Sequence, residues 1–195
     1  MGDQKFQRKR YSTPRHPWEK ERIDSERQVV AKYGLKNKRE LWKAEAILSS
    51  YRAQARTLQA KVRYNDPIAE KQFQLLLKKL DKLSLLSEGA TLDDILALNI
   101  ENILDRRLQT LVYQLNMATT MKQARQLITH GHIKVGDHIV TIPSIAVLKG
   151  QEDSITYNEK SPFSDDKHPI RLILAGIQEK EDKEEPEKAS KGEAQ

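Results

Sequence analysis

Long polar side chains recur at helical spacing between residues 119 and 130. Read at about 100° per residue, they gather on one face of a helix, and Ala124, Leu127 and Ile128 fall on the other. The polar face contains no carboxylate, whereas a helix face that is only solvated usually mixes both signs of charge. This pattern favours a partner rich in phosphate. The candidate binding residues are Thr119, Thr120, Lys122, Gln123, Arg125, Gln126 and His130.

Local signals define the helices around this face. Thr120 and Gln123 form the T-x-x-Q pattern of a capping box, which predicts a helix start, and Gly131 predicts the helix end. A preceding helix is expected over residues 104–115, with a leucine-rich stripe on one side. Asn116 should end it, because asparagine tolerates the left-handed conformation after a helix. Its polar side should carry Arg106, Thr110, Tyr113 and Gln114.

A short hairpin is expected directly after the second helix. Residues 132–135 alternate as a strand and place His132 and Lys134 on the same side. Gly136 and Asp137 suit a two-residue turn of type II′, and residues 138–142 form the returning strand. Two helices and a hairpin would therefore build one platform to which both contribute donors.

Several stretches of the chain carry a family resemblance. They are RRLQT (106–110), KQARQLI (122–128), HGHI (130–133), Pro143 with Ser144, and, in the N-terminal part, PRHPW (14–18) and ELWK (40–43). These stretches resemble the S4 RNA-binding domain, most of all its version in the archaeal and eukaryotic small-subunit ribosomal protein S4 family. The resemblance covers all but about the last seventeen residues. It departs from the family at Asn116 and Met117, where Gly-Leu is usual, and at Met121, where Pro is frequent.

The resemblance implies an α+β protein in which a helical N-terminal region brackets a small S4-type module of two helices and a short antiparallel sheet. It implies a structural constituent of the small ribosomal subunit that binds small-subunit (16S) rRNA directly and early in assembly. It also implies a role in translational accuracy near the channel by which mRNA enters, beside neighbouring proteins of the accuracy centre. mRNA is a further candidate partner there, and Arg106 and Arg107 join the candidate RNA-binding residues.

Charge is distributed unevenly along the 195 residues, whose net charge is +6 and whose pI is near 9.4. Residues 1–63 carry +10, residues 64–178 carry −1 and residues 179–195 carry −3. The N-terminal third should therefore supply most of the attraction to a polyanion. Further candidate RNA-binding residues in this third are Arg8, Lys9, Arg10, Arg15, Arg52, Arg56, Lys61 and Arg63.

Four segments are predicted along the chain. Residues 1–17 form a basic arm, which composition alone would equally allow to be a disordered terminus and which the resemblance implies becomes ordered on RNA. Residues 18–104 are helical, with helices expected at 18–33, 37–62 and 66–87 and a shorter one after Thr91. Residues 105–177 form the S4-type domain, closed by strands at 155–157 and 170–174. Residues 178–195 are an acidic disordered tail.

Enzymatic chemistry finds no support in the sequence. It contains no glycine-rich phosphate loop, no G-x-S-x-G motif and no cysteine, so a cysteine nucleophile and disulfides are excluded. His130, His132 and His138 could be imagined as a metal site, but donors or stacking surfaces beside RNA fit them better, so no metal or cofactor is expected. No apolar run is long enough to span a membrane, and we expect a cytoplasmic, ribosome-bound protein.

Two other classes of function remain as alternatives. The S4-type module also occurs in RNA-modifying and aminoacylating enzymes, as an accessory domain, but these need a catalytic domain that the remaining residues do not provide. A free-standing RNA-binding factor would not explain why a basic N-terminal third flanks the module.

Overall fold

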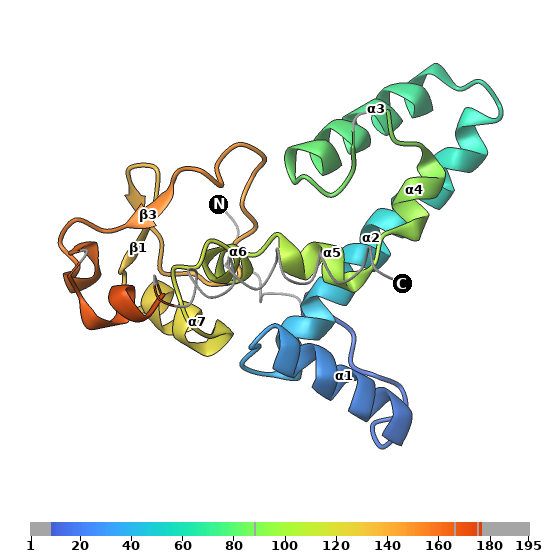
Figure 1. Cartoon of the computed structure of the whole chain (residues 1–195). Coiled ribbons are helices and arrows are strands. Elements are labelled where there is room, and N and C mark those ends of the chain that lie inside the picture. The colour runs from blue at the N-terminus through green and yellow to red at the C-terminus, as the bar shows by residue number, and fades with distance from the viewer. Residues whose placement is uncertain (1–8, 88, 166, 175, 177–195) are drawn as a thin grey trace, which may run out of the picture. The chain divides into compact units, whose positions relative to one another are not determined.

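The computed structural model describes residues 9–87, 89–165, 167–174 and 176. The chain divides into two compact units, unit 1 (Met1–Arg106) and unit 2 (Arg107–Gln195), which we describe separately (Figure 1). The division falls two residues after the start that we predicted for the S4-type domain. The predicted acidic tail, the first eight residues of the predicted arm and the candidate Arg8 lie outside the described residues.

Unit 1 consists of helices, three of which have their N-caps at the predicted starts, residues 37, 66 and 91. The Asn37 side chain accepts a hydrogen bond from the Glu40 N–H at 3.3 Å, and the Asp66 side chain accepts one from the Ile68 N–H at 3.0 Å. Thr91 and Asp94 form a capping box. The helices are α1 (Lys20–Lys32), α2 (Lys38–Val62), α3 (Pro67–Lys82), α4 (Leu92–Ala97) and α5 (Ile100–Asp105).

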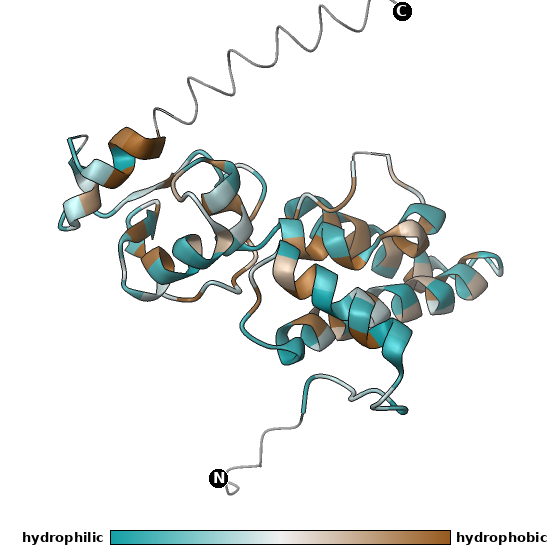
Figure 2. Ribbon diagram, turned by 60° about the horizontal axis from the view of Figure 1, so that its bottom comes forward, coloured by the Kyte–Doolittle hydropathy of each residue, from teal (hydrophilic) through white to brown (hydrophobic). Residues whose placement is uncertain are grey.

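The core of unit 1 lies along α2. Buried leucines and alanines of α2 pack against Leu76 and Leu80 of α3 and against Ile95 of α4. In Figure 2 the exposed sides of these helices are largely hydrophilic. Helix α3 ends at Lys82, earlier than the predicted residue 87, because Ser84 adopts a left-handed φ of 52° and its neighbours satisfy the last carbonyls of the helix.

In the described part of unit 2, two short helices precede a three-stranded antiparallel sheet in the order β2-β1-β3, and further short helical segments follow it. Val135 pairs with His138, so Gly136 and Asp137 form the two-residue turn that we predicted, with a positive φ of 59° at Gly136. Ile133 pairs with Tyr157 on the other side of β1. The elements are α6 (Leu108–Gln114), α7 (Met121–Thr129), β1 (Ile133–Val135), β2 (His138–Ile139), β3 (Ile155–Tyr157) and the 3-10 helix η1 (Pro162–Ser164).

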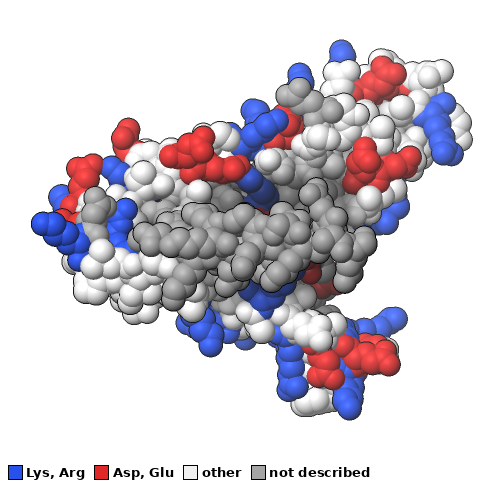
Figure 3. Space-filling view, viewed as in Figure 1, with Lys and Arg blue, Asp and Glu red and all other residues white. Residues whose placement is uncertain are grey.

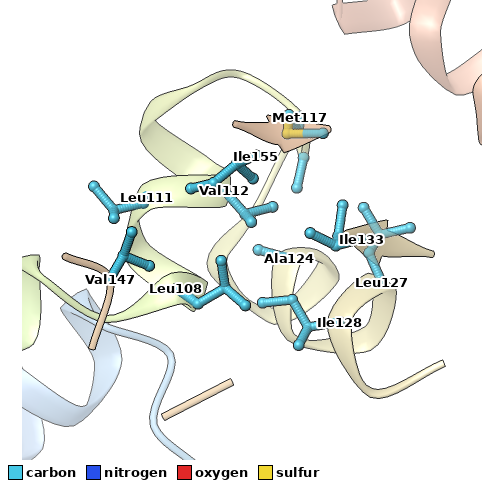
Figure 4. Close-up of a cluster of buried hydrophobic side chains, with 11 residues drawn as sticks. Leu108, Leu111, Val112, Met117, Ala124, Leu127, Ile128, Ile133, Val147 and Ile155 are labelled. Atoms are coloured by element: carbon cyan, nitrogen blue, oxygen red, sulfur yellow. The ribbon is translucent and has the colours of Figure 1, made fainter. Parts of the chain in front are cut away.

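The core of unit 2 joins the inner faces of α6 and α7 to the sheet (Figure 4). Val112, Ile128 and Ile133 are fully buried at its centre, and Val147 and Ile155 close it from later in the chain. The Tyr157 hydroxyl donates a 2.6 Å hydrogen bond to the Met117 carbonyl and so fastens β3 to the loop after α6. This core sets the orientation of α7.

The predicted helix over residues 104–115 is interrupted. Arg107 is extended, with φ −77° and ψ 142°, and separates α5 from α6. The loop after β2 covers the start of α6, since the Leu108 N–H donates to the Ile145 carbonyl at 2.9 Å. Thr110, which we expected on the polar side, is 3% exposed and therefore buried. The predicted end is confirmed, because Asn116 adopts a left-handed φ of 52°.

The predicted strand at residues 170–174 is wrong, because residues 169–174 are helical. The His168 carbonyl accepts from the Leu172 N–H at 3.1 Å, and the His168 ring accepts from the Ile170 N–H at 3.2 Å. Pro169 therefore stands at the first helical position, which it favours. The segment is mostly brown in Figure 2, and a short apolar run of this kind does not distinguish helix from strand.

Candidate nucleic-acid interface

Helix α7 has the two faces predicted from its spacing. Ala124, Leu127 and Ile128 are buried in the core, whereas Lys122, Gln126 and His130 are exposed. The charged side chains visible over α7 in Figure 3 are blue. Because the sequence of α7 contains no acidic residue, this exposed row of donors has no competing carboxylate on its own helix.

Three candidate residues at the start of α7 form hydrogen bonds with one another. The Thr120 hydroxyl accepts from the Gln123 N–H at 3.2 Å, as a capping residue does. The Gln123 side-chain oxygen accepts from the Thr119 N–H at 2.8 Å and also from the Thr119 hydroxyl. The first role of Thr119, Thr120 and Gln123 is therefore to stabilise the start of the helix. Gln123 is only half-buried, so part of its side chain remains accessible beside Lys122 and Gln126.

Arg125 is positioned by a buried side chain that the sequence analysis missed. Gln109 of α6 is 1% exposed and donates from Nε2 to the Met121 carbonyl at 2.9 Å. Its Oε1 accepts from Arg125 Nη1 at 3.3 Å. The guanidinium thus lies beside the exposed row in a defined place, held from the core. The sequence pattern did not predict the burial of Gln109, because glutamine is usually found on the polar face of an amphipathic helix.

The two arginines at the boundary between the units differ. Arg106 is half-buried at the end of α5. Arg107 is 6% exposed, pairs with Ala146 through an isolated β-bridge and precedes α6. A side chain with so little exposed surface has little to offer a ligand. The structure therefore disfavours Arg107 as a direct RNA contact and gives it a place in the packing of α6.

Aromatic rings extend from the end of α7 across β1. The His130 and His132 ring centroids lie 6.3 Å apart, and His132 meets Phe163 edge-on at 4.9 Å. Phe163 in turn lies 4.6 Å from the His168 ring. His132 Nδ1 also lies 2.8 Å from the Ser161 hydroxyl. Phe163, Ser161 and His168 were not predicted, since only the fold brings them to β1.

His132 is tuned toward the neutral form. Burial, and then the charge of His130, lower the pKa of His132 from its ordinary value of 6.5. At neutral pH its ring therefore offers a flat, uncharged surface together with one hydrogen-bonding nitrogen. Rings of this kind suit stacking with unpaired bases.

Lys134 on β1 carries a local counter-charge. Its Nζ lies 2.7 Å from Glu159 Oε1, and this hydrogen bond lowers the pKa of the Glu159 carboxyl. The Glu159 side chain is 84% exposed. Such an exposed pair is weak, so a phosphate could exchange with the carboxylate. Lys134 is therefore available as a donor only in competition with Glu159.

The basic candidates on α2 and just after it differ in whether they are exposed or held by a protein contact. Arg56, Lys61 and Arg63 are exposed. Arg52 is half-buried and donates from Nη2 to the Leu98 carbonyl at 2.5 Å, which satisfies the end of α4. Three of the four are thus open to solvent in unit 1, and Arg52 has a structural partner.

The described part of the N-terminal arm packs onto α1 and α2. The Tyr11 and Trp42 rings lie 6.0 Å apart, and Lys9 Nζ lies 4.6 Å above the Tyr11 ring. Arg10 and Arg15 are exposed. A cleft of about 420 Å³ runs between residues 12–16 and the two helices. The arm is therefore held against the helices by its own contacts, and Arg10 and Arg15 stay exposed to solvent.

One carboxylate anchors this arrangement. Glu26 is 9% exposed and accepts from Arg22 Nη1 at 2.6 Å and from Trp42 Nε1 at 3.2 Å. Lys38 Nζ lies 2.8 Å from its second oxygen. Arg22 also donates from Nη2 to the His16 and Pro17 carbonyls at 2.9 and 3.1 Å. A chain of contacts thus runs from the α2 surface through Glu26 to the backbone of the arm.

Hydrogen bonding outweighs burial at this carboxylate. Burial alone would raise the pKa of Glu26, but hydrogen bonds from Lys38, Trp42 and Arg22 and the charge of Lys38 hold that pKa below its ordinary value. Glu26 therefore stays ionised at neutral pH.

The described residues contain no group of three or more His, Asp or Glu side chains that could hold a metal ion. None of the helices in the described part of the chain is long and apolar enough to cross a membrane.

Two family models together match residues 5–153 of the chain. The S4 domain matches residues 106–153, and the ribosomal protein S4/S9 N-terminal domain matches residues 5–105. The chain belongs to the ribosomal protein S4 family. The donor row of α7 lies within the S4 domain of this family member, and the Glu26 anchor lies within its N-terminal domain. The predicted family and the α+β class are confirmed.

Curated relatives carry the name small ribosomal subunit protein uS4. The chain is 71% identical over 181 residues to that of Picrophilus torridus, an alignment covering 93% of this chain and 99% of the relative. It is 59% identical over 174 residues to that of Thermoplasma acidophilum, covering 89% and 87%, and 47% identical over 167 residues to that of Nanoarchaeum equitans, covering 86% and 92%. This S4-family chain is a structural ribosomal protein and not an enzyme.

Proposed function

We propose that this chain is a constituent of the small ribosomal subunit in the cytoplasm and binds 16S rRNA directly through the exposed face of α7. The observation that carries the proposal is the row of Lys122, Gln126 and His130, which is exposed, free of acidic residues and held by a core that matches the S4 domain. Donors of this kind contact phosphates and sugar hydroxyls, and the adjacent rings offer surfaces to unpaired bases.

Unit 1 supplies a second RNA-binding surface in this proposal. Arg10 and Arg15 on the arm and Arg56, Lys61 and Arg63 on α2 and its end are exposed and basic. Each phosphate that such a surface neutralises releases counterions, so the logarithm of the affinity should fall linearly with the logarithm of salt concentration. Two surfaces on one chain can hold two segments of rRNA together, which is the property of an early assembly protein.

The salt dependence of binding tests the proposal. Purified protein should bind small-subunit rRNA at moderate salt with a steep salt slope, and it should bind duplex DNA more weakly at the same salt. Early binding further requires that rRNA stripped of all other proteins is sufficient. Equal affinity for duplex DNA, or a need for other subunit proteins before any binding, would contradict the proposal.

We also infer a place near the channel by which mRNA enters, beside the neighbouring proteins that govern accuracy. The support is family membership together with two surfaces that can bind different RNA strands. Crosslinking from single cysteines on α7 and on the arm in assembled subunits tests this. Adducts with mRNA or with those neighbours would support it, and adducts confined to rRNA far from the channel would contradict it.

A further inference from the structure

A groove on unit 1 has no place in the RNA-binding proposal. It has a volume of about 580 Å³ and lies between α2 and α3. The α2 wall offers small or neutral side chains, including Ser50, Ala53 and Thr57, and Leu58 and Leu76 form the floor. Small side chains on one wall would allow another backbone to approach closely.

Apolar side chains stand exposed along the α3 wall. Leu75 lines the groove and is 66% exposed, and Ile68, seven residues earlier and so on the same side of the helix, is 64% exposed. Neither belongs to the buried stripe of Ala69, Leu76 and Leu80. Phosphates and ribose hydroxyls are polar, so the RNA backbone complements such aliphatic side chains poorly. This wall therefore suits a protein segment rather than RNA.

The surroundings of the groove are basic. Lys79 lines it and is held with Nζ 5.5 Å above the Tyr51 ring of α2. A second hollow of about 350 Å³ shares Leu75 and Lys79 and is bordered by Lys78, Lys82 and Asp81. Three lysines against one aspartate around an exposed leucine complement a segment that carries acidic residues beside an apolar stripe.

We propose that this groove, defined by its α2 and α3 walls, docks an acidic amphipathic helix of a neighbouring small-subunit protein. The apolar stripe of that helix covers Leu75 and Ile68, and its acidic flank meets Lys78, Lys79 and Lys82. A second copy of this chain does not fit, because Lys78, Lys79 and Lys82 of one copy would face the same lysines of the other. Residues 179–195 of this chain are acidic but lack large apolar residues. The proposal rests on the assignment to the small subunit.

Cysteine accessibility tests the groove directly, because the chain contains no cysteine. We compare Leu75→Cys with Gln74→Cys, an exposed neighbour on α3 that lines neither hollow. Both thiols should react equally fast with a maleimide in the free protein. In assembled small subunits the thiol of Leu75→Cys should react at least tenfold more slowly than the thiol of Gln74→Cys. Equal rates in the subunit would overturn the proposal.

A photoreactive maleimide at position 75 then identifies what covers the groove. Mass spectrometry of the adduct should find a helical segment of another subunit protein with acidic residues beside apolar ones. An adduct with rRNA, with a second copy of this chain or with residues 179–195 would overturn the proposal. Deleting residues 179–195 should leave the protection at position 75 unchanged.

Introducing a charge of either sign at the same position tests complementarity. Leu75→Glu should be retained about tenfold less than wild type in subunits assembled in competition, and Leu75→Lys should be affected clearly less. Because Leu75 is exposed, thermal unfolding of both variants should match wild type. Binding to isolated rRNA should also be unchanged; a loss there would assign the groove to the RNA interface instead. Failure of the wild type itself to bind rRNA would refute the proposed function and not the groove.

Discussion

Replacing Glu26 by Gln tests whether the N-terminal arm is anchored before RNA arrives. The carboxylate receives hydrogen bonds or ion pairs from Arg22, Trp42 and Lys38. A glutamine keeps the shape but removes the charge and points an amide N–H₂ group toward donors. Removing one partner of a fully buried ion pair costs about 3–5 kcal/mol. Because the Arg22 and Lys38 side chains are 25% and 33% exposed, water recovers part of this loss. We expect a loss of about 2–3 kcal/mol in the free energy of unfolding.

The same change should alter RNA binding through the arm. Arg22 holds the His16 and Pro17 carbonyls, so its release from Glu26 loosens the segment that presents Arg10 and Arg15. Each phosphate contact contributes roughly 0.7–0.9 to the slope of log affinity against log salt. Loss of two contacts should therefore make the slope shallower by roughly 1.5.

Chemical denaturation followed by tryptophan fluorescence measures the stability loss, since Trp42 lies in the anchor and Trp18 is 91% exposed. Filter binding to rRNA over a range of salt concentrations measures the slope. Glu19→Gln is the matched control, because it makes the same charge change beside Arg22 in a more exposed pair with an N–O distance of 3.6 Å. Its cost should be below about 0.5 kcal/mol. If the two variants unfold alike and bind with the same slope, Glu26 does not anchor the arm.

Further outcomes are expected at other sites. Leu127→Ala should lower the free energy of unfolding by roughly 2–5 kcal/mol, measured by calorimetry or denaturant, because it leaves a core cavity. Lys122→Ala should weaken rRNA binding and leave the free energy of unfolding unchanged. An equal loss of stability in both variants would show that the faces of α7 are misassigned. Arg125→Ala should weaken rRNA binding with at most a small loss of stability, measured by the same two assays. Because the folded-state pKa of His132 lies below 6.5, its contribution to stability is full above pH 6.5 and is lost as pH falls through the folded pKa; pH-dependent melting should show this loss, and His132→Asn should reduce it. Removing residues 1–15 should make the salt slope of rRNA binding shallower, and removing residues 179–195 should leave affinity constant or slightly raised.

Much of the local structure could be predicted because its signals lie within a few residues. Thr120 and Gln123 define the start of α7, Asn116 ends α6, and Gly136 forms the hairpin turn. Periodicity alone also separated Leu127 and Ile128 from Lys122 and Gln126. These features depend on neighbours along one helix or turn, and the sequence displays such neighbours directly.

The remaining parts of the fold depend on distant residues. The backbone N–H groups of Leu108 and Gln109 donate to the Ile145 and Pro143 carbonyls, more than thirty positions later, and helical periodicity does not predict such contacts. The apolar run at 170–174 is compatible with a strand or a helix, and the structure shows a helix that begins at Pro169 and is capped by His168. A proline preceded by a side-chain acceptor was the signal that could have decided it.

The candidate site shows the same limit. The types and spacing of the α7 donors were sufficient to nominate them, but the sequence did not show which cations already have protein partners. Arg52 bonds to the Leu98 carbonyl, Lys134 to Glu159, and Arg125 to a buried glutamine. Glu26 was missed because an acidic residue in a basic region does not suggest a part in holding the N-terminal arm.

The way in which later residues complete α6 has a consequence for synthesis. The Leu108 and Gln109 N–H groups find their acceptors at Ile145 and Pro143, and β1 receives its second neighbour only at residues 155–157. Unit 1, by contrast, is built from helices that all pack on α2 and is complete by residue 106. On a translating ribosome unit 1 can therefore fold while unit 2 is still being made. A premature stop between residues 140 and 155 would release a folded unit 1 joined to an α6–α7 hairpin with exposed apolar surface, a product suited to degradation rather than to incorporation into a subunit.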